Sequence, residues 1–199
     1  MAVSSHEVES FFSTVQNIFN YFSESPKRWA LLQSHALKSK RIVLKNLSDT
    51  RWSSRALAVK CIKDNIPNIY DALTEISESS NYDSKAKKLA SQLGKRIFKF
   101  KFVLSAIIWN EFLARVNVVS KILQSKSIDF GSCLHHLAKA QEYFQKVHGD
   151  ESIFDAFFEM AEKRANEMNI PVEFSLIDSL SLRSLRNKGK YFKQVCYEI

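Results

Sequence analysis

The fold is decided by residues 98–123, which read FKFKFVLSAIIWNEFLARVNVVSKIL. Apolar side chains would surround much of the circumference of a helix built from this stretch, and such a helix has to be buried. We therefore expect it to be the central element of the core. Glu111 and Arg115 lie four residues apart on it, a spacing at which two side chains can form an ion pair.

Amphipathic segments flank this stretch on both sides. Apolar residues recur at helical spacing from residue 6 to 23, and Ser25-Pro26 then predicts the N-cap and first residue of a short helix. Further helices are expected at residues 52–65, from Pro67 to about 76, from Asp83 or Ser84 onward, at 129–148 and at 150–168. Helical periodicity is lost from Lys38 to Leu47, where Ile42-Val43-Leu44 predicts a short strand or an extended linker near residues 40–47.

Gly94 is the weak point of the helical pattern that leads into the central stretch. Glycine costs helix stability, so we expect a break or kink there. At the other end of the chain, Asn169-Ile170-Pro171 is expected to end the last helix.

Composition agrees with an all-helical protein. Of 199 residues 45% are hydrophobic, enough for a real core, and 4 Gly with 3 Pro are too few for the turns of an all-β protein. No strand–helix alternation is present. The prediction is an all-α multi-helix bundle over residues 6–174, followed by a basic, weakly ordered tail at 175–199.

Several functional classes find no support in the sequence. There is no apolar run near 18 residues and no signal peptide, so neither a membrane location nor secretion is expected. Cys61, Cys133 and Cys196 are too few and too widely spaced for a disulfide framework. Cys133 and His136 could hold two metal ligands, but no second pair follows, so no metal site is predicted. Neither a phosphate-binding loop nor a catalytic triad motif occurs, so we expect no enzyme, no cofactor and no small-molecule substrate.

The net charge of +8 is unevenly distributed. Ten basic residues face a single acid over residues 26–63, seven face none over 85–101, and five face none over 183–193. Clusters of this kind attract a phosphate backbone, but lysine-rich solvated helix faces are also common.

A second informative stretch is residues 47–55, which read LSDTRWSSR. Ser48, Asp49 and Thr50 are candidate N-caps for the helix that follows. The indole of Trp52 can pack as a buried anchor or stack on a nucleic-acid base, and residue chemistry alone favours the anchor.

Several blocks of the chain resemble hAT-superfamily transposases, nearest the branch related to the MYM-type zinc finger proteins. The first block comprises Phe11-Phe12, Phe22, Trp29, residues 47–55, Val59-Lys60 and residues 69–73. Residues 117–129 (NVVSKILQSKSID) form the second, and 169–174 and 185–190 also match, so the resemblance covers roughly residues 10–195.

The resemblance implies a specific part of a transposase. In that family an RNase H-like fold holds three carboxylates and two metal ions and is interrupted by a large helical insertion. Arg51-Trp52 matches an Arg-Trp motif near the start of this insertion, where the tryptophan stacks at the transposon end. The chain resembles the insertion alone, with two carboxylates expected before residue 1 and the third near or beyond residue 199.

A non-catalytic, truncated transposon-derived domain with residual DNA binding is therefore the leading hypothesis, since two-metal catalysis needs all its carboxylates in one site. A nuclear location is expected by resemblance, and otherwise a cytoplasmic one. The predicted DNA contacts are Arg51, Trp52, Arg55, Lys45, Arg41 and Lys60.

Two alternatives stay open. The chain could be a helical protein–protein interaction or structural module, including a homo-oligomer, which exposed Phe11, Phe154 or Phe158 would favour. It could also be a gene-model fragment without independent function.

Overall fold

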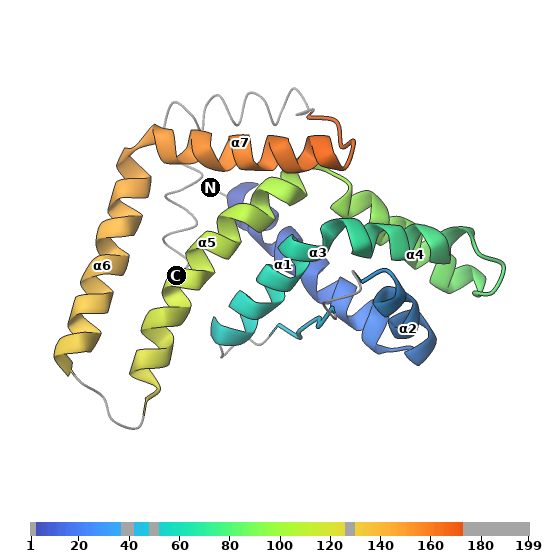
Figure 1. Ribbon diagram of the computed structural model, residues 1–199, viewed down its shortest axis with the longest axis horizontal. Helices are drawn as coiled ribbons and strands as arrows, with labels where there is room; N and C mark the ends of the chain where they lie inside the picture. Colours follow the sequence, from blue (N-terminus) through green and yellow to red (C-terminus); the bar gives the residue numbers. More distant parts are fainter. Residues whose placement is uncertain (1–2, 37–41, 48–51, 126–129, 173–199) are drawn as a thin grey trace.

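The computed structural model describes residues 3–36, 42–47, 52–125 and 130–172 (Figure 1). Within these ranges every regular element is an α-helix, so the prediction of an all-α fold is confirmed. The predicted tail at 175–199 and the candidate caps Ser48, Asp49, Thr50 and Asp129 lie outside the described residues. In chain order the helices are α1 (Val3–Ser23), α2 (Pro26–Ser34), α3 (Trp52–Glu78), α4 (Ser84–Ile97), α5 (Phe100–Leu123), α6 (Phe130–Gly149) and α7 (Glu151–Glu167).

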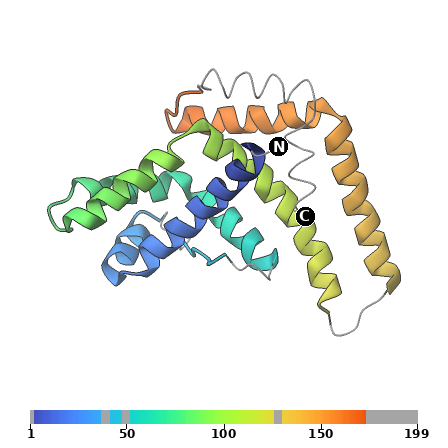
Figure 2. The same ribbon diagram turned by 180° about the vertical axis from the view of Figure 1, so that it is seen from behind.

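Helix α5 is the central helix of the core, as predicted. It packs against α3 most extensively, against α7 and α6, and to a smaller extent against α4. Figures 1 and 2 show α5 passing through the middle of the molecule, with α7 across its first turns and α6 beside its second half. Its fully buried residues include Val103, Phe112 and Leu113, each 0% exposed.

The same helix is long and apolar enough to cross a membrane by length and composition alone. An 18-residue window of α5 has a mean hydropathy of 1.4, although the sequence contains no uninterrupted apolar run of that length. Half of this window is buried inside the protein, and core helices of soluble proteins pass the same test.

Capping residues mark the helix ends that the sequence predicted. The Ser25 and Asp83 side chains accept hydrogen bonds from the backbone N–H groups of Arg28 and Ala86, at 3.4 and 2.7 Å. Asp150 caps α7 in the same way, and its hydrogen bonds from Ser152 hold the pKa of Asp150 below its ordinary value.

The last helix ends at the predicted Asn-Ile-Pro sequence. Asn169 has a positive φ of 54°, and the Ile170 N–H donates to the Ala165 carbonyl at 2.8 Å. This geometry is a Schellman motif, in which a left-handed residue satisfies the last carbonyls of a helix. Ile170 is 3% exposed, so the motif also directs an apolar side chain into the core.

The predicted break at Gly94 is wrong. Helix α4 continues through Gly94 to Ile97, and the chain leaves the helix at Phe98 and Lys99 instead. Gly94 is buried against α3, where an added Cβ would lie 3.8 Å from the Tyr70 ring. Close helix packing therefore offsets the local cost of glycine. The separate helices expected at 52–65 and from Pro67 are the two halves of α3, which meet at a kink where Asn65 leaves helical geometry (φ −126°, ψ 18°).

The segment at residues 42–47 carries neither helix nor strand, and it is held against the first two helices. Gln33 donates to the Ile42 carbonyl at 2.7 Å, and the Leu47 N–H donates to the Gln16 side chain at 2.9 Å. Ile42 and Leu44 are buried, so this segment contributes to the core.

The predicted Glu111–Arg115 ion pair forms within α5, and its arginine also contacts α6. Arg115 contacts the Glu111 carboxylate at 2.8 Å, and its guanidinium lies 3.6 Å from the centroid of the Tyr143 ring. Burial raises the pKa of Tyr143 above its ordinary value, although the charge of Arg115 opposes this shift. A cation over an aromatic face is attracted to it, so this contact connects the two helices.

Replacement of Phe112 by Ala tests the central role of α5. Phe112 is 0% exposed and contacts the rings of Trp109, Phe144 and Phe157. We expect Phe112→Ala to lower the free energy of unfolding by about 3–5 kcal/mol, the usual cost of this substitution in a core. The measurement is urea denaturation followed by circular dichroism. Leu57→Ala, at a position on α3 that is 50% exposed, is the control and should change stability by less than about 0.5 kcal/mol.

Candidate nucleic-acid interface

Trp52 and Arg55 lie on the first turn of α3, where the sequence predicted DNA contacts. Trp52 is half-buried and packs against the hydrophobic core. The Arg55 guanidinium is 5.5 Å from the centroid of the Phe12 ring and 5.6 Å from that of Trp52. Both side chains therefore have intramolecular roles, and the arrangement agrees with the interpretation of Trp52 as an anchor.

The remaining predicted contacts divide into two groups. Lys45 and Lys60 are exposed and form no ion pair within the part of the chain that the structure describes. Arg41 and Arg51 lie outside the described residues. The structure therefore leaves Lys45 and Lys60 as accessible positive charges and does not place the predicted set of six as one surface.

Several other basic residues of the 26–63 cluster are engaged within the protein. Lys27 donates to the Asn81 carbonyl at 2.8 Å and lies 4.6 Å from the Tyr82 ring centroid. Arg28 pairs with Glu24 at 3.6 Å and lies 4.3 Å from the Tyr21 ring centroid.

The environment of Tyr21 and Tyr82 also changes their pKa values. Burial raises the pKa values of Tyr21 and Tyr82 above the ordinary value, and Arg28 acts in the opposite direction on both. Tyr21 further donates to the Ala86 carbonyl at 3.0 Å. The basic residues here connect α1 and α2 to the turn before α4.

The clearest unpaired positive surface lies on α4. Lys85, Lys88, Lys95 and Arg96 are all exposed, and within the described ranges none of them forms an ion pair. Lys88, Lys95 and Arg96 follow Lys85 by three, ten and eleven residues, and these separations place all four side chains on one side of the helix. The opposite side carries the buried residues Ala90, Leu93, Gly94 and Ile97.

The contact residues predicted from the sequence do not include this surface. The charge count identifies the basic run at 85–101, but the predicted residues follow the Arg-Trp motif. Helical spacing alone could have identified the α4 surface, because its basic and apolar residues separate cleanly at a period of 3.6 residues.

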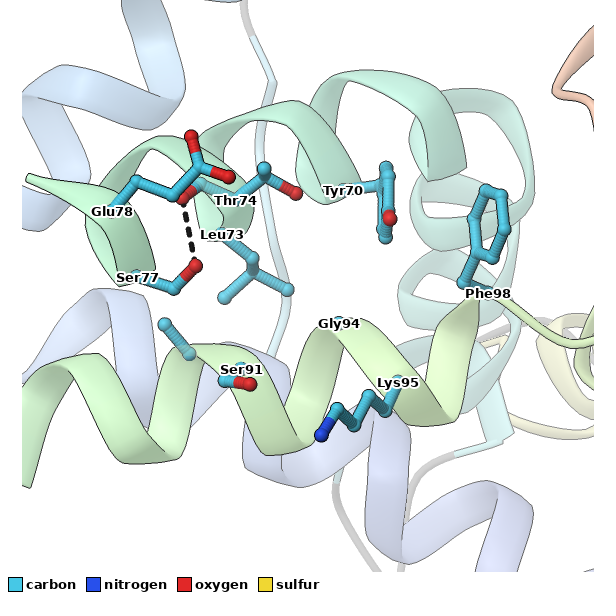
Figure 3. Close-up of a pocket in the computed structure, with 10 residues that line it drawn as sticks. Tyr70, Leu73, Thr74, Ser77, Glu78, Ser91, Gly94, Lys95 and Phe98 are labelled. Carbon is cyan, nitrogen blue, oxygen red and sulfur yellow. Dashed lines mark hydrogen bonds between the residues drawn. The ribbon is translucent and has the colours of Figure 1, made fainter.

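A groove of about 330 Å³ lies beside this basic surface, between α3 and α4 (Figure 3). Tyr70 and Phe98 stack at one end, with ring centroids 4.5 Å apart and planes at 22°. Polar side chains from both helices border the groove, and the Ser77 hydroxyl donates to the Thr74 carbonyl at 2.9 Å. The full lining is Tyr70, Leu73, Thr74, Ser77, Glu78, Ala90, Ser91, Gly94, Lys95 and Phe98.

Cys133 and His136 on α6 are not part of a cluster of candidate metal ligands among the described residues. Cys133 is buried, whereas His135 is exposed and His136 half-buried. Among the described residues, no group of three or more His, Cys, Asp or Glu side chains is placed to hold a metal ion.

Known protein families and solved structures provide no match to this chain: no protein-family model matches the sequence, and no solved structure matches the fold.

Substitution of Trp52 tests whether its indole is a structural anchor. We expect Trp52→Ala to lower the free energy of unfolding by about 2 kcal/mol, less than for a fully buried aromatic residue because Trp52 is half-buried. Trp52→Phe should restore most of this stability. Urea denaturation measures both, and an unchanged stability of Trp52→Ala would show that the indole makes no stabilising contact.

Proposed function

We propose that this chain is a non-catalytic helical module that binds DNA through the phosphate backbone. The observation that carries the proposal is the row of exposed, unpaired basic residues on α4: Lys85, Lys88, Lys95 and Arg96. Basic side chains on one helix face can neutralise neighbouring phosphates and release their counterions. Lys45 and Lys60 are candidates for additional contacts.

The resemblance to hAT transposases supports the same proposal from the sequence side. In that family basic surfaces of the helical insertion contact DNA, and this chain resembles that insertion. In this proposal the chain derives from a transposon and acts in the nucleus. Trp52 and Arg55 then support the start of α3, and α4 supplies the principal phosphate contacts.

Removal of the α4 charges tests this proposal. We expect Lys85→Ala/Lys88→Ala/Arg96→Ala to weaken binding of duplex DNA. Each phosphate that is no longer neutralised should also reduce the slope of log K against log salt by about 0.9. Fluorescence anisotropy with a labelled duplex, measured across a salt series, gives both quantities.

The matched control removes three exposed lysines from α5 and α6. Lys121→Ala/Lys139→Ala/Lys146→Ala changes the net charge by the same amount and should leave more of the affinity in place. Equal reductions in affinity for the two triple variants would mean that net charge alone, and no α4 surface, attracts DNA. Absence of binding at low salt would contradict the proposal.

A protein-interaction module is the second candidate, and one surface favours it. On α6, Phe130 is 73% exposed, Leu134 53% and Leu137 43%, and their three- and four-residue spacing aligns them. An apolar stripe of this kind is typical of contact with another protein. The residues that the sequence suggested for such contact do not form it, because Phe11 is buried and Phe154 and Phe158 are half-buried against the core.

Light scattering distinguishes this candidate. If the α6 stripe mediates self-association, the protein forms an oligomer that persists at high salt, and Phe130→Asp converts it to a monomer. Leu57→Asp, at an exposed apolar position on α3, is the control and should leave the mass unchanged. A monomer at all salt concentrations would remove the case for self-association.

A further inference from the structure

An exposed glutamine lies at the centre of the basic surface on α4. Gln92 follows Lys88 by four residues, which makes the two side chains direct neighbours on the helix surface. Lys95 and Arg96 follow Gln92 by three and four residues and are neighbours in the same way, and Lys85 lies two turns earlier on the same side. The sequence of α4 contains no acidic residue, so the charged neighbours of Gln92 on this helix are all cations.

This surface faces away from the protein core. The side chains that α4 buries lie on the opposite side of the helix, which packs mainly against α3. Figures 1 and 2 show α4 at the end of the molecule that is remote from α6. From Lys85 to Arg96 the surface is about 16 Å long, which corresponds to the axial rise of roughly five base pairs of duplex DNA. The described part of the chain therefore leaves this side of α4 open to a large partner.

The positive charges are divided between the two edges of this surface. Because an α-helix turns once in about 3.6 residues, Lys88 and Lys95 lie to one side of Gln92. By the same geometry Lys85 and Arg96 lie to the other side. The major groove of duplex DNA has the complementary arrangement, because phosphates line both of its edges and hydrogen-bonding base edges form its floor. The groove is about 12 Å wide and admits an α-helix, so α4 matches it in both charge and shape.

We infer that α4 binds in the major groove of duplex DNA and that Gln92 reads an adenine there. The inference rests on the proposed function, because the basic residues would hold the helix against the phosphates of both strands. The Gln92 amide carries both a donor and an acceptor, and it can form two hydrogen bonds with N6 and N7 of adenine. Leu89, which is 38% exposed and lies three residues before Gln92, would contact the methyl group of a thymine. The preferred ligand is therefore duplex DNA that contains A·T pairs.

7-Deazaadenine is the informative base analogue. It lacks the N7 acceptor in the major groove but leaves the phosphates, the base pairing and the minor groove unchanged. We therefore expect an alternating A·T duplex that contains this analogue to bind roughly tenfold more weakly than the unmodified duplex, within the discrimination usual for a bidentate base contact. Fluorescence anisotropy at constant salt measures this ratio.

Two substitutions separate base reading from phosphate contact. Gln92→Ala should bind the two duplexes with nearly equal affinity and keep the same salt dependence, because no phosphate contact is lost. Lys88→Ala should weaken the binding of both duplexes equally and reduce the slope of log K against log salt by about 0.9. Gln141→Ala, at an exposed glutamine on α6, is the matched control and should leave the ratio of the two affinities unchanged.

The outcomes separate failure of base reading from failure of DNA binding. Equal affinity of the unaltered protein for the two duplexes, or a ratio that persists in Gln92→Ala, would overturn the role of Gln92 and leave phosphate binding intact. Duplex RNA should bind more weakly than duplex DNA, because its major groove is too deep and narrow for side chains to read. Equally tight binding of RNA would place α4 on phosphates outside the groove and overturn the inference. Absence of DNA binding at low salt would contradict the proposed function and the inference with it.

Discussion

The burial of α5 is the constraint on which the rest of the structure depends. A 24-residue helix with apolar side chains around most of its circumference cannot be left in water, and no single neighbouring helix can cover it. Helices α3, α7, α6 and α4 each contribute an apolar stripe to this task. The aromatic contacts of Phe112 with Phe144 and Phe157 show how side chains from α6 and α7 complete the cover.

This packing also determines where positive charge remains accessible. Helix α4 directs Ala90, Leu93, Gly94 and Ile97 inward, so its exposed basic residues are left together on the outside. Lys27 and Arg28 have the same charge but lie beside Tyr82 and Tyr21, where cation–π contacts hold them. A basic residue is therefore available to a phosphate only where the fold leaves it without an aromatic or acidic neighbour.

Much of the fold could be predicted because helix signals are local. Ser25, Asp83 and Asp150 cap helices through hydrogen bonds that span two or three residues, and Asn169 ends α7 by its own backbone conformation. Gly94 is the instructive failure. Its local preference indicates a break, but burial of Gly94 in the packing of α4 favours a continuous helix, and that burial cannot be read from neighbouring residues. The candidate site shows the same division, since the Arg-Trp motif indicated α3 whereas the row of four exposed basic residues lies on α4.

The sequence by itself determined the all-helical class, the central position of α5, most helix boundaries and the excess of positive charge. These properties follow from composition, from the period of apolar residues and from capping within a single turn. Only the tertiary structure decided which basic residues are unpaired, that Trp52 packs against the core, and that Tyr70, Glu78 and Lys95 border one groove. The physical reason is that pairing, burial and concave shape are properties of residues from different helices, and they exist only once those helices have packed together.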